Sequence, residues 1–167
     1  MGGGYLSLRK KYDKEEKGRG MCVDVRKTCE CGAAIVQFHL RDNLLHSGVI
    51  QRVFCPNCPG DVGFDARSML NDNGWVVEYD MILATMLLTA KLQVEPEAVC
   101  PEFLFDRGYA CWLEMYPGER EEIREEKEKI MALLREDQRQ YLQAIQSWNI
   151  QRIARLKGAG WRKAQQA

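Results

Sequence analysis

Apolar residues occupy every second position in several short stretches of the first half of the chain. Val36, Phe38 and Leu40 show this period, which predicts a strand with one face in a core. The strands predicted in this way are residues 21–26, 34–41, 49–54 and 75–79. Between the last two we expect a short helix over residues 65–70 and a turn over residues 71–74, where Asn and Gly gather. The first half therefore predicts a small antiparallel sheet.

The hydrophobic period changes to that of a helix after residue 80. Asp80 can cap a helix over residues 81–92, whose apolar side chains cover most of its circumference, so we expect a largely buried core helix. Residues 101–116 are rich in aromatic side chains and begin with Pro101, a residue favoured at the first helical position. They predict a second helix packed on the sheet.

The last third of the chain is typical of a long helix. After Gly118 there is no proline or glycine until Gly158, which predicts one helix of about 39 residues and about 58 Å. An imperfect heptad stripe, interrupted at Asp137, runs along it. Its members are Ile123, Ile130, Leu133, Leu134, Tyr141, Ile145, Trp148 and Ile153. Such a stripe requires cover from the chain's own domain, a second copy or a different protein.

Charge is segregated along the chain although the 24 Lys and Arg balance the 24 Asp and Glu. Residues 1–29 carry eight basic side chains against four acidic ones, residues 30–117 five against twelve, and residues 138–167 six against none. The basic ends predict binding to nucleic acid or to an acidic partner, or else folding onto the acidic middle of the chain. The candidate phosphate contacts are Arg9, Lys10, Lys11, Lys14, Lys17, Arg19, Arg152, Arg155, Lys157, Arg162 and Lys163.

The cysteines point to metal binding rather than to disulfides. There are seven, an odd number, and no export signal or membrane-spanning segment is expected, so we predict reduced thiols in a cytoplasmic protein. Cys29 pairs with Cys31, and Cys55 with Cys58, with twenty-three residues between the pairs. Two tight pairs joined by a hairpin are what a tetrahedral four-thiolate zinc site requires, and four protein ligands leave no open position for catalysis. We therefore predict one structural zinc ion per chain, with iron as the alternative metal.

The two cysteine pairs resemble the knuckles of zinc-ribbon modules. Cys55-Pro56-Asn57-Cys58 matches their Cys-Pro-x-Cys turn, and Cys31-Gly32 matches their Cys-Gly ending. The spacing Cys29-x-Cys31 is one residue shorter than the usual pair. The order Cys-x-Cys then Cys-x-x-Cys is also similar to the zinc domain of an oxidation-activated bacterial holdase, a resemblance that implies zinc release under oxidant.

Other reactive residues predict no second site. Cys22, Cys100 and Cys111 lack a tight-pair spacing, and His39 and His46 are expected to be surface residues. The sequence has no catalytic triad pattern and no phosphate-binding loop, so we do not expect an enzyme.

The sequence thus predicts an α+β fold in which a small antiparallel zinc-ribbon sheet packs on helices and is followed by a long C-terminal helix. The expected parts are a flexible basic arm (1–20), a zinc-ribbon-like β domain (21–80), a helical core segment (81–117), the long helix (118–157) and a basic tail (158–167). The expected function is a structural zinc protein that binds a protein partner, or itself, through the C-terminal helix. The alternatives are a nucleic-acid-binding zinc ribbon and a redox-switched zinc chaperone.

Overall fold

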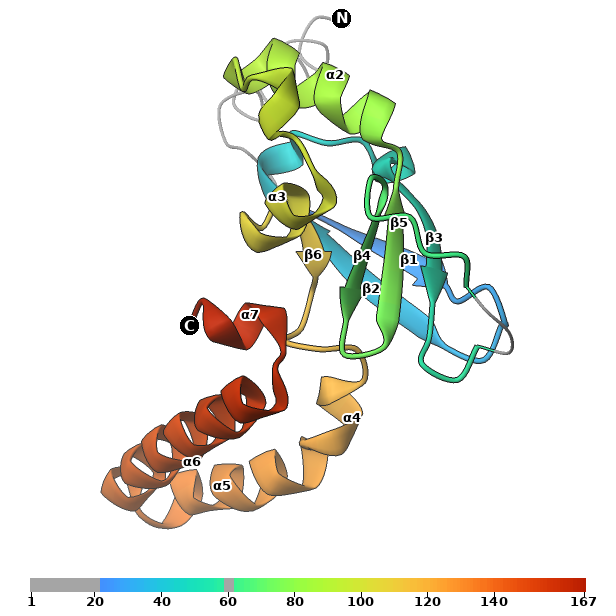
Figure 1. Ribbon diagram of the computed structural model, residues 1–167. Helices are drawn as coiled ribbons and strands as arrows, with labels where there is room; N and C mark the ends of the chain where they lie inside the picture. The colour runs from blue at the N-terminus through green and yellow to red at the C-terminus, as the bar shows by residue number, and fades with distance from the viewer. Residues whose placement is uncertain (1–21, 59–61) are drawn as a thin grey trace, which may run out of the picture.

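Strands and helices combine in an α+β fold, which confirms the predicted fold class (Figure 1). The computed structural model describes residues 22–58 and 62–167. The predicted arm over residues 1–20 lies outside the described residues, as does Met21 of the first predicted strand. Among the helices that the structure describes, none has the length and apolar character needed to cross a membrane.

Two three-stranded antiparallel sheets form the centre of the molecule, where the sequence predicted a single sheet. The first sheet has the order β1 (Val23–Thr28), β2 (Ile35–Leu40) and β6 (Ala110–Trp112). The second has the order β3 (Ile50–Phe54), β5 (Trp75–Tyr79) and β4 (Met69–Asp72). Four of these six strands, β1, β2, β3 and β5, lie where the alternating pattern predicted strands.

One hydrophobic core joins the two sheets. On β2 the buried residues are Val36, Phe38 and Leu40, as the period of two predicted. Val77 and Tyr79 on β5 belong to the same cluster. The Tyr79 hydroxyl donates a hydrogen bond of 2.7 Å to the carbonyl oxygen of Ala110 in β6, which ties the second sheet to the first inside the core.

The short helix predicted over residues 65–70 is wrong, because Met69–Asp72 forms strand β4. β4 and β5 make a hairpin whose two-residue turn is Asn73-Gly74, with φ of 49° and 89°. An Asn-Gly pair is favoured in such a turn because both residues must adopt positive φ. The turn was thus predicted at the right place, but it is shorter than residues 71–74, because Asn71 and Asp72 belong to the strand that was missed.

The helix predicted over residues 101–116 ends in fewer than two turns. α3 spans Pro101–Asp106, and the chain then reverses through Gly108 at φ +73°. The following residues form β6, whose Trp112 pairs with Phe38 of β2. Pairing with an open sheet edge buries Trp112 more completely than a surface helix would, so tertiary packing overrides the local helical pattern.

The helix α2 (Met81–Leu92) begins where it was predicted, but it is not largely buried. The Asp80 carboxylate caps it by accepting a 3.0 Å hydrogen bond from the Leu83 N–H. Within α2 only Ala84 and Leu88 are fully buried. The opposite face lies on the outer surface of the molecule (Figure 1).

The single helix predicted over residues 118–157 is instead broken into a hairpin. Its segments are α4 (Glu119–Glu122), α5 (Arg124–Glu136) and α6 (Gln138–Ala159). The break falls at Asp137, which leaves helical geometry with φ −149° and ψ 106°. Its carboxylate accepts hydrogen bonds from the N–H groups of Arg139 and Gln140, so it caps a new helix instead of continuing the old one. α6 remains a long C-terminal helix, and it packs beside α5 (Figure 1).

The end of the chain docks back on the sheets. α7 (Arg162–Gln165) buries Ala164 in a small second core with Tyr116 and Leu156. The ring of Tyr116 stacks on Trp161 at 5.0 Å between centroids. The segment 158–167, predicted as a basic tail, is therefore an anchored element that fixes the base of the hairpin.

A buried ion pair between Glu119 and Arg152 joins α4 to α6 at this base, and each residue is 7% exposed. Glu119 also accepts a 3.0 Å hydrogen bond from the Met115 N–H. We expect Glu119→Ala to lower the free energy of unfolding by about 3 kcal/mol, because it leaves the guanidinium of Arg152 buried without a counter-charge. Urea unfolding of the purified protein measures this loss.

The control is Glu121→Ala on the same short helix, where the side chain is exposed and the expected change is within about 0.5 kcal/mol. The double variant Glu119→Leu, Arg152→Met should regain most of the lost stability, since an apolar pair needs no charge compensation. Equal stability of Glu119→Ala and the parent protein would contradict a structural role for this pair.

Candidate metal centre

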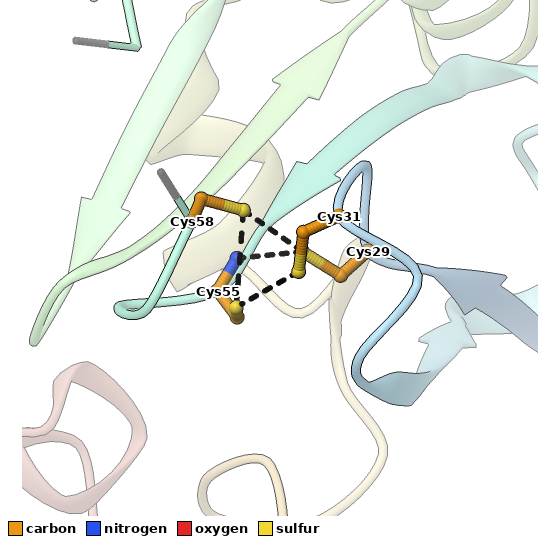
Figure 2. Close-up of side chains that lie close together, drawn as sticks. All are labelled: Cys29, Cys31, Cys55 and Cys58. Carbon is orange, nitrogen blue, oxygen red and sulfur yellow. Dashed lines mark hydrogen bonds between the residues drawn. The ribbon is translucent and has the colours of Figure 1, made fainter. Parts of the chain in front are cut away.

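Two tight turns bring the four cysteines to one point between the two sheets. Cys29 and Cys31 lie in the turn that joins β1 to β2, and Cys55 and Cys58 directly follow β3. In the first turn the Gly32 N–H donates a 2.8 Å hydrogen bond to the Cys29 carbonyl oxygen. In the second the Cys58 N–H donates to the Cys55 carbonyl oxygen at 3.0 Å. Figure 2 shows that the side chains of the two turns point toward one another.

The sulfur atoms are spaced as ligands of a single metal ion. The Cys29 and Cys58 sulfurs are 3.1 Å apart, Cys31 lies 3.4 Å from Cys29 and 3.5 Å from Cys55, and Cys55 lies 3.8 Å from Cys58. All four sulfurs lie within 4.8 Å of one another. A tetrahedron with zinc–sulfur bonds of about 2.3 Å has edges of about 3.8 Å, which falls inside this spread. The four cysteines thus lie within metal-binding distance of one another, as the spacing predicted.

Backbone contacts hold the two turns against each other. The Glu30 N–H donates to the carbonyl oxygen of Val53 at 2.9 Å, and the Cys55 N–H donates to the Cys29 sulfur at 2.9 Å. The second contact stabilises negative charge on Cys29, the form in which cysteine binds metal. The centre is therefore preorganised by the peptide backbone as well as by the side chains.

The electrostatics favour a thiolate at Cys29. Burial raises its pKa, but hydrogen bonds from the backbone at Cys31, from the Cys58 side chain and from the backbone at Cys55 lower the pKa to about 7. The hydrogen bond to Cys29 raises the pKa of Cys58 to about 12. Burial raises the pKa of Cys55. A bound cation would take the place of the protons that Cys55 and Cys58 otherwise retain, since metal binding to thiols releases protons.

Exposure differs among the four candidate ligands. Cys29 and Cys55 are buried, with 2% and 6% of their surface exposed, whereas Cys31 is exposed and Cys58 is half-buried. One side of the centre therefore faces the sheets and the other faces solvent. A metal there would join three strands and stay accessible to chelators and oxidants on its outer side.

The remaining cysteines and histidines stand apart from this cluster within residues 22–58 and 62–167. Cys22 and Cys100 are exposed, and Cys111 is buried in the hydrophobic core. His39 contacts Asp24 at 3.2 Å, and the ring of His46 accepts a hydrogen bond from a backbone N–H. Of the two histidines predicted at the surface, His46 is exposed and His39 is half-buried.

Gly74 supports the metal centre, and sequence reasoning did not identify this role. It lies in the β4–β5 turn at φ +89°, and a Cβ atom there would approach the Cβ of Pro56 to 3.3 Å. The hairpin turn therefore packs closely on the Cys-Pro-x-Cys turn. The Asn-Gly pair predicted the turn, but no sequence signal showed what the turn contacts.

The basic residues near the C-terminus make contacts within the chain. Arg162 pairs with Asp106 at 2.6 Å, and the Lys163 amino group donates to the carbonyl oxygens of Trp112 and Glu114. Arg152 pairs with Glu119 inside the hairpin base. The Lys157 amino group donates to the carbonyl oxygen of Ala167 at 2.7 Å. Four of the five C-terminal candidates for phosphate binding thus make contacts within the chain, and Arg162 pairs with the acidic middle as the alternative of folding onto it predicted.

Comparison of the chain with protein-family models, with curated proteins and with solved structures found no match.

Proposed function

We propose that this chain is a structural zinc protein that acts as a binding or assembly subunit. The observation that carries the proposal is the closed set of four sulfurs held between two sheets. Four thiolates are the typical ligand set of structural zinc, and they leave no position for water or substrate. The centre would thus support folding and not catalysis, and we propose a cytoplasmic protein because the thiolates need a reducing compartment.

The binding surface in this proposal is the hairpin of α5 and α6. No residue of α5 is fully buried by the described part of the chain. The seam residues Ile130, Leu133, Ile145 and Trp148 are only half-buried between the two helices. A pair of helices cannot enclose its own seam, and stable bundles add further helices around it.

Exposed apolar side chains gather at the far end of the hairpin. Met131 and Leu134 on the last turns of α5 are 50% and 43% exposed, and Leu142 near the start of α6 is 57% exposed. These three residues, together with the half-buried seam, form what we call the hairpin tip. The anchored base makes the hairpin a rigid arm that presents this tip to another protein, which would add helices to complete the bundle.

The proposal is tested by identifying a partner through cross-linking in cells and then measuring its affinity with both proteins purified. Leu134→Glu and Leu142→Glu place a carboxylate in the apolar contact, so we expect each to weaken binding at least about tenfold. The matched control is Ile35→Glu on β2, whose side chain is 66% exposed and lies outside the hairpin tip. If both tip variants bind the partner with the affinity of the parent chain, the hairpin is not the binding surface.

A further inference from the structure

A second apolar surface lies on α2, away from the metal centre. Ile82 and Met86 are 86% and 58% exposed, and Ala90 continues their row at the same spacing of four residues. Residues four apart share one face of a helix, so these side chains form a continuous ridge. The adjoining row is Met81, Thr85 and Thr89, and an open groove along both rows is bordered by Pro96 of the 3-10 turn Pro96–Ala98. We call this surface the α2 face.

The α2 face carries no charge. Lys91 is the charged residue within α2, and its amino group turns to the other side, where it donates to the carbonyl oxygens of Asn43 and Leu44. Asp80 is engaged in capping the helix. Docking on the two rows therefore requires no desolvation of a charged side chain of α2.

The distribution of large and small residues makes the face complementary to itself in the antiparallel direction. A twofold axis near Met86 would set Ile82 of one copy against Ala90 of the other, and each Met86 against its equivalent. A large residue at one end then fits over a small residue at the other, as a symmetric dimer requires because both copies use the same patch. The antiparallel arrangement also brings the positive N-terminal end of one α2 beside the negative C-terminal end of the other.

We propose that the α2 face is a homodimer interface whose occupant is α2 of a second copy of this chain. α2 has 12 residues and is about 18 Å long, so one helix on one helix covers far less than the roughly 800 Å² per partner of a standard interface. The dimer is therefore reversible, with a dissociation constant in roughly the micromolar range. A dimer would present two copies of the proposed hairpin. It would therefore bind with higher avidity to a partner that carries two or more copies of the hairpin's binding site.

Sedimentation velocity of the full zinc-loaded chain should show a monomer–dimer equilibrium. The dimer fraction should rise as the protein concentration is raised above the low micromolar range. Met86→Lys and Met86→Glu should each be monomeric, because the twofold axis places two like charges together. An equimolar mixture of the two variants should dimerise again, since opposite charges then meet at the axis. Met86 is more than half exposed, so both variants are expected to fold, and circular dichroism and zinc content check this.

The matched control is Ile150→Lys, which places the same charge on α6 at a side chain that is 64% exposed. It should dimerise like the parent chain, whereas loss of the dimer in this variant would assign self-association to the hairpin and overturn the proposal. A monomer at every concentration, a dimer that persists in Met86→Lys, or a mixture that stays monomeric would each overturn it as well. The Met86→Lys variant should still bind a protein partner through the hairpin. Loss of the dimer therefore tests the α2 face, whereas loss of partner binding tests the proposed function.

Discussion

Replacing Cys29 by Ser is expected to abolish the proposed zinc binding and to unfold the region in which the two sheets meet. Cys29 is buried, lies within 3.4 Å of the Cys31 and Cys58 sulfurs, and accepts the backbone N–H of Cys55. Zinc binds to the structural sites of zinc-finger peptides with an apparent free energy of about 10–16 kcal/mol. This is comparable to the total free energy of unfolding of a domain. Elemental analysis and circular dichroism of the purified variant measure both effects, and a strong chelator should reproduce them in the parent chain.

The matched control is Cys22→Ser, because Cys22 is exposed and outside the cluster. That variant should retain one zinc per chain and the parent melting curve. Retention of a full zinc equivalent by Cys29→Ser would contradict the four-thiolate site. If the purified protein contains iron and shows the visible absorption of an iron–thiolate centre, the metal is iron and not zinc.

Mild peroxide separates the structural role of the metal from the redox-switch alternative. Cys31 is exposed, so oxidant can reach the outer side of the centre. In a structural site the zinc content should survive mild treatment and no new apolar surface should appear. Rapid zinc release together with binding of a hydrophobic dye would instead favour the holdase-like switch that the cysteine order resembles.

The features predicted correctly from the sequence are those fixed by neighbours along the chain. Alternation set the buried face of β2, Asp80 fixed the start of α2, and Asn73-Gly74 fixed a hairpin turn. The two cysteine pairs came together because each tight turn positions two sulfurs and the strands between them form antiparallel sheets. Zinc binding by these cysteines stays a prediction that awaits elemental analysis.

The features that the sequence did not reveal depend on contacts between distant residues. Ala110–Trp112 has a helical pattern, but it pairs with the free edge of β2. The local sequence does not indicate which strand in the sheet has a free edge. Asp137 can either continue a helix or cap the next one with its carboxylate. The packing of α5 beside α6 favours the capping conformation. The exposed face of α2 was likewise mistaken for core, because an apolar helix face that stays exposed and one that is buried have the same composition.

Truncating Trp112 to Ala will lower the free energy of unfolding by about 3–5 kcal/mol, the largest effect expected away from the metal centre. Trp112 is 1% exposed, and its ring packs on Phe38 at 5.0 Å, on Phe105 at 5.7 Å and on Trp75 at 6.0 Å between centroids. These neighbours come from both sheets and α3, so they cannot collapse together into the space left by an indole. For a chain of this size the melting temperature of the purified protein should fall by roughly 10 °C.

Two further variants separate packing from hydrogen bonding at Trp112. Its indole N–H donates a 2.8 Å hydrogen bond to the Asp72 carboxylate, which also accepts the Arg162 N–H at 3.2 Å. Trp112→Phe keeps most of the ring contacts and removes this donor, so we expect a smaller loss of about 1–3 kcal/mol. Trp148→Ala removes the same side chain from the half-buried seam of the hairpin and should cost less than Trp112→Ala. If Trp148→Ala proved as damaging as Trp112→Ala, the hairpin would be part of the cooperative core, and its role as a separate arm for a partner would have to be abandoned.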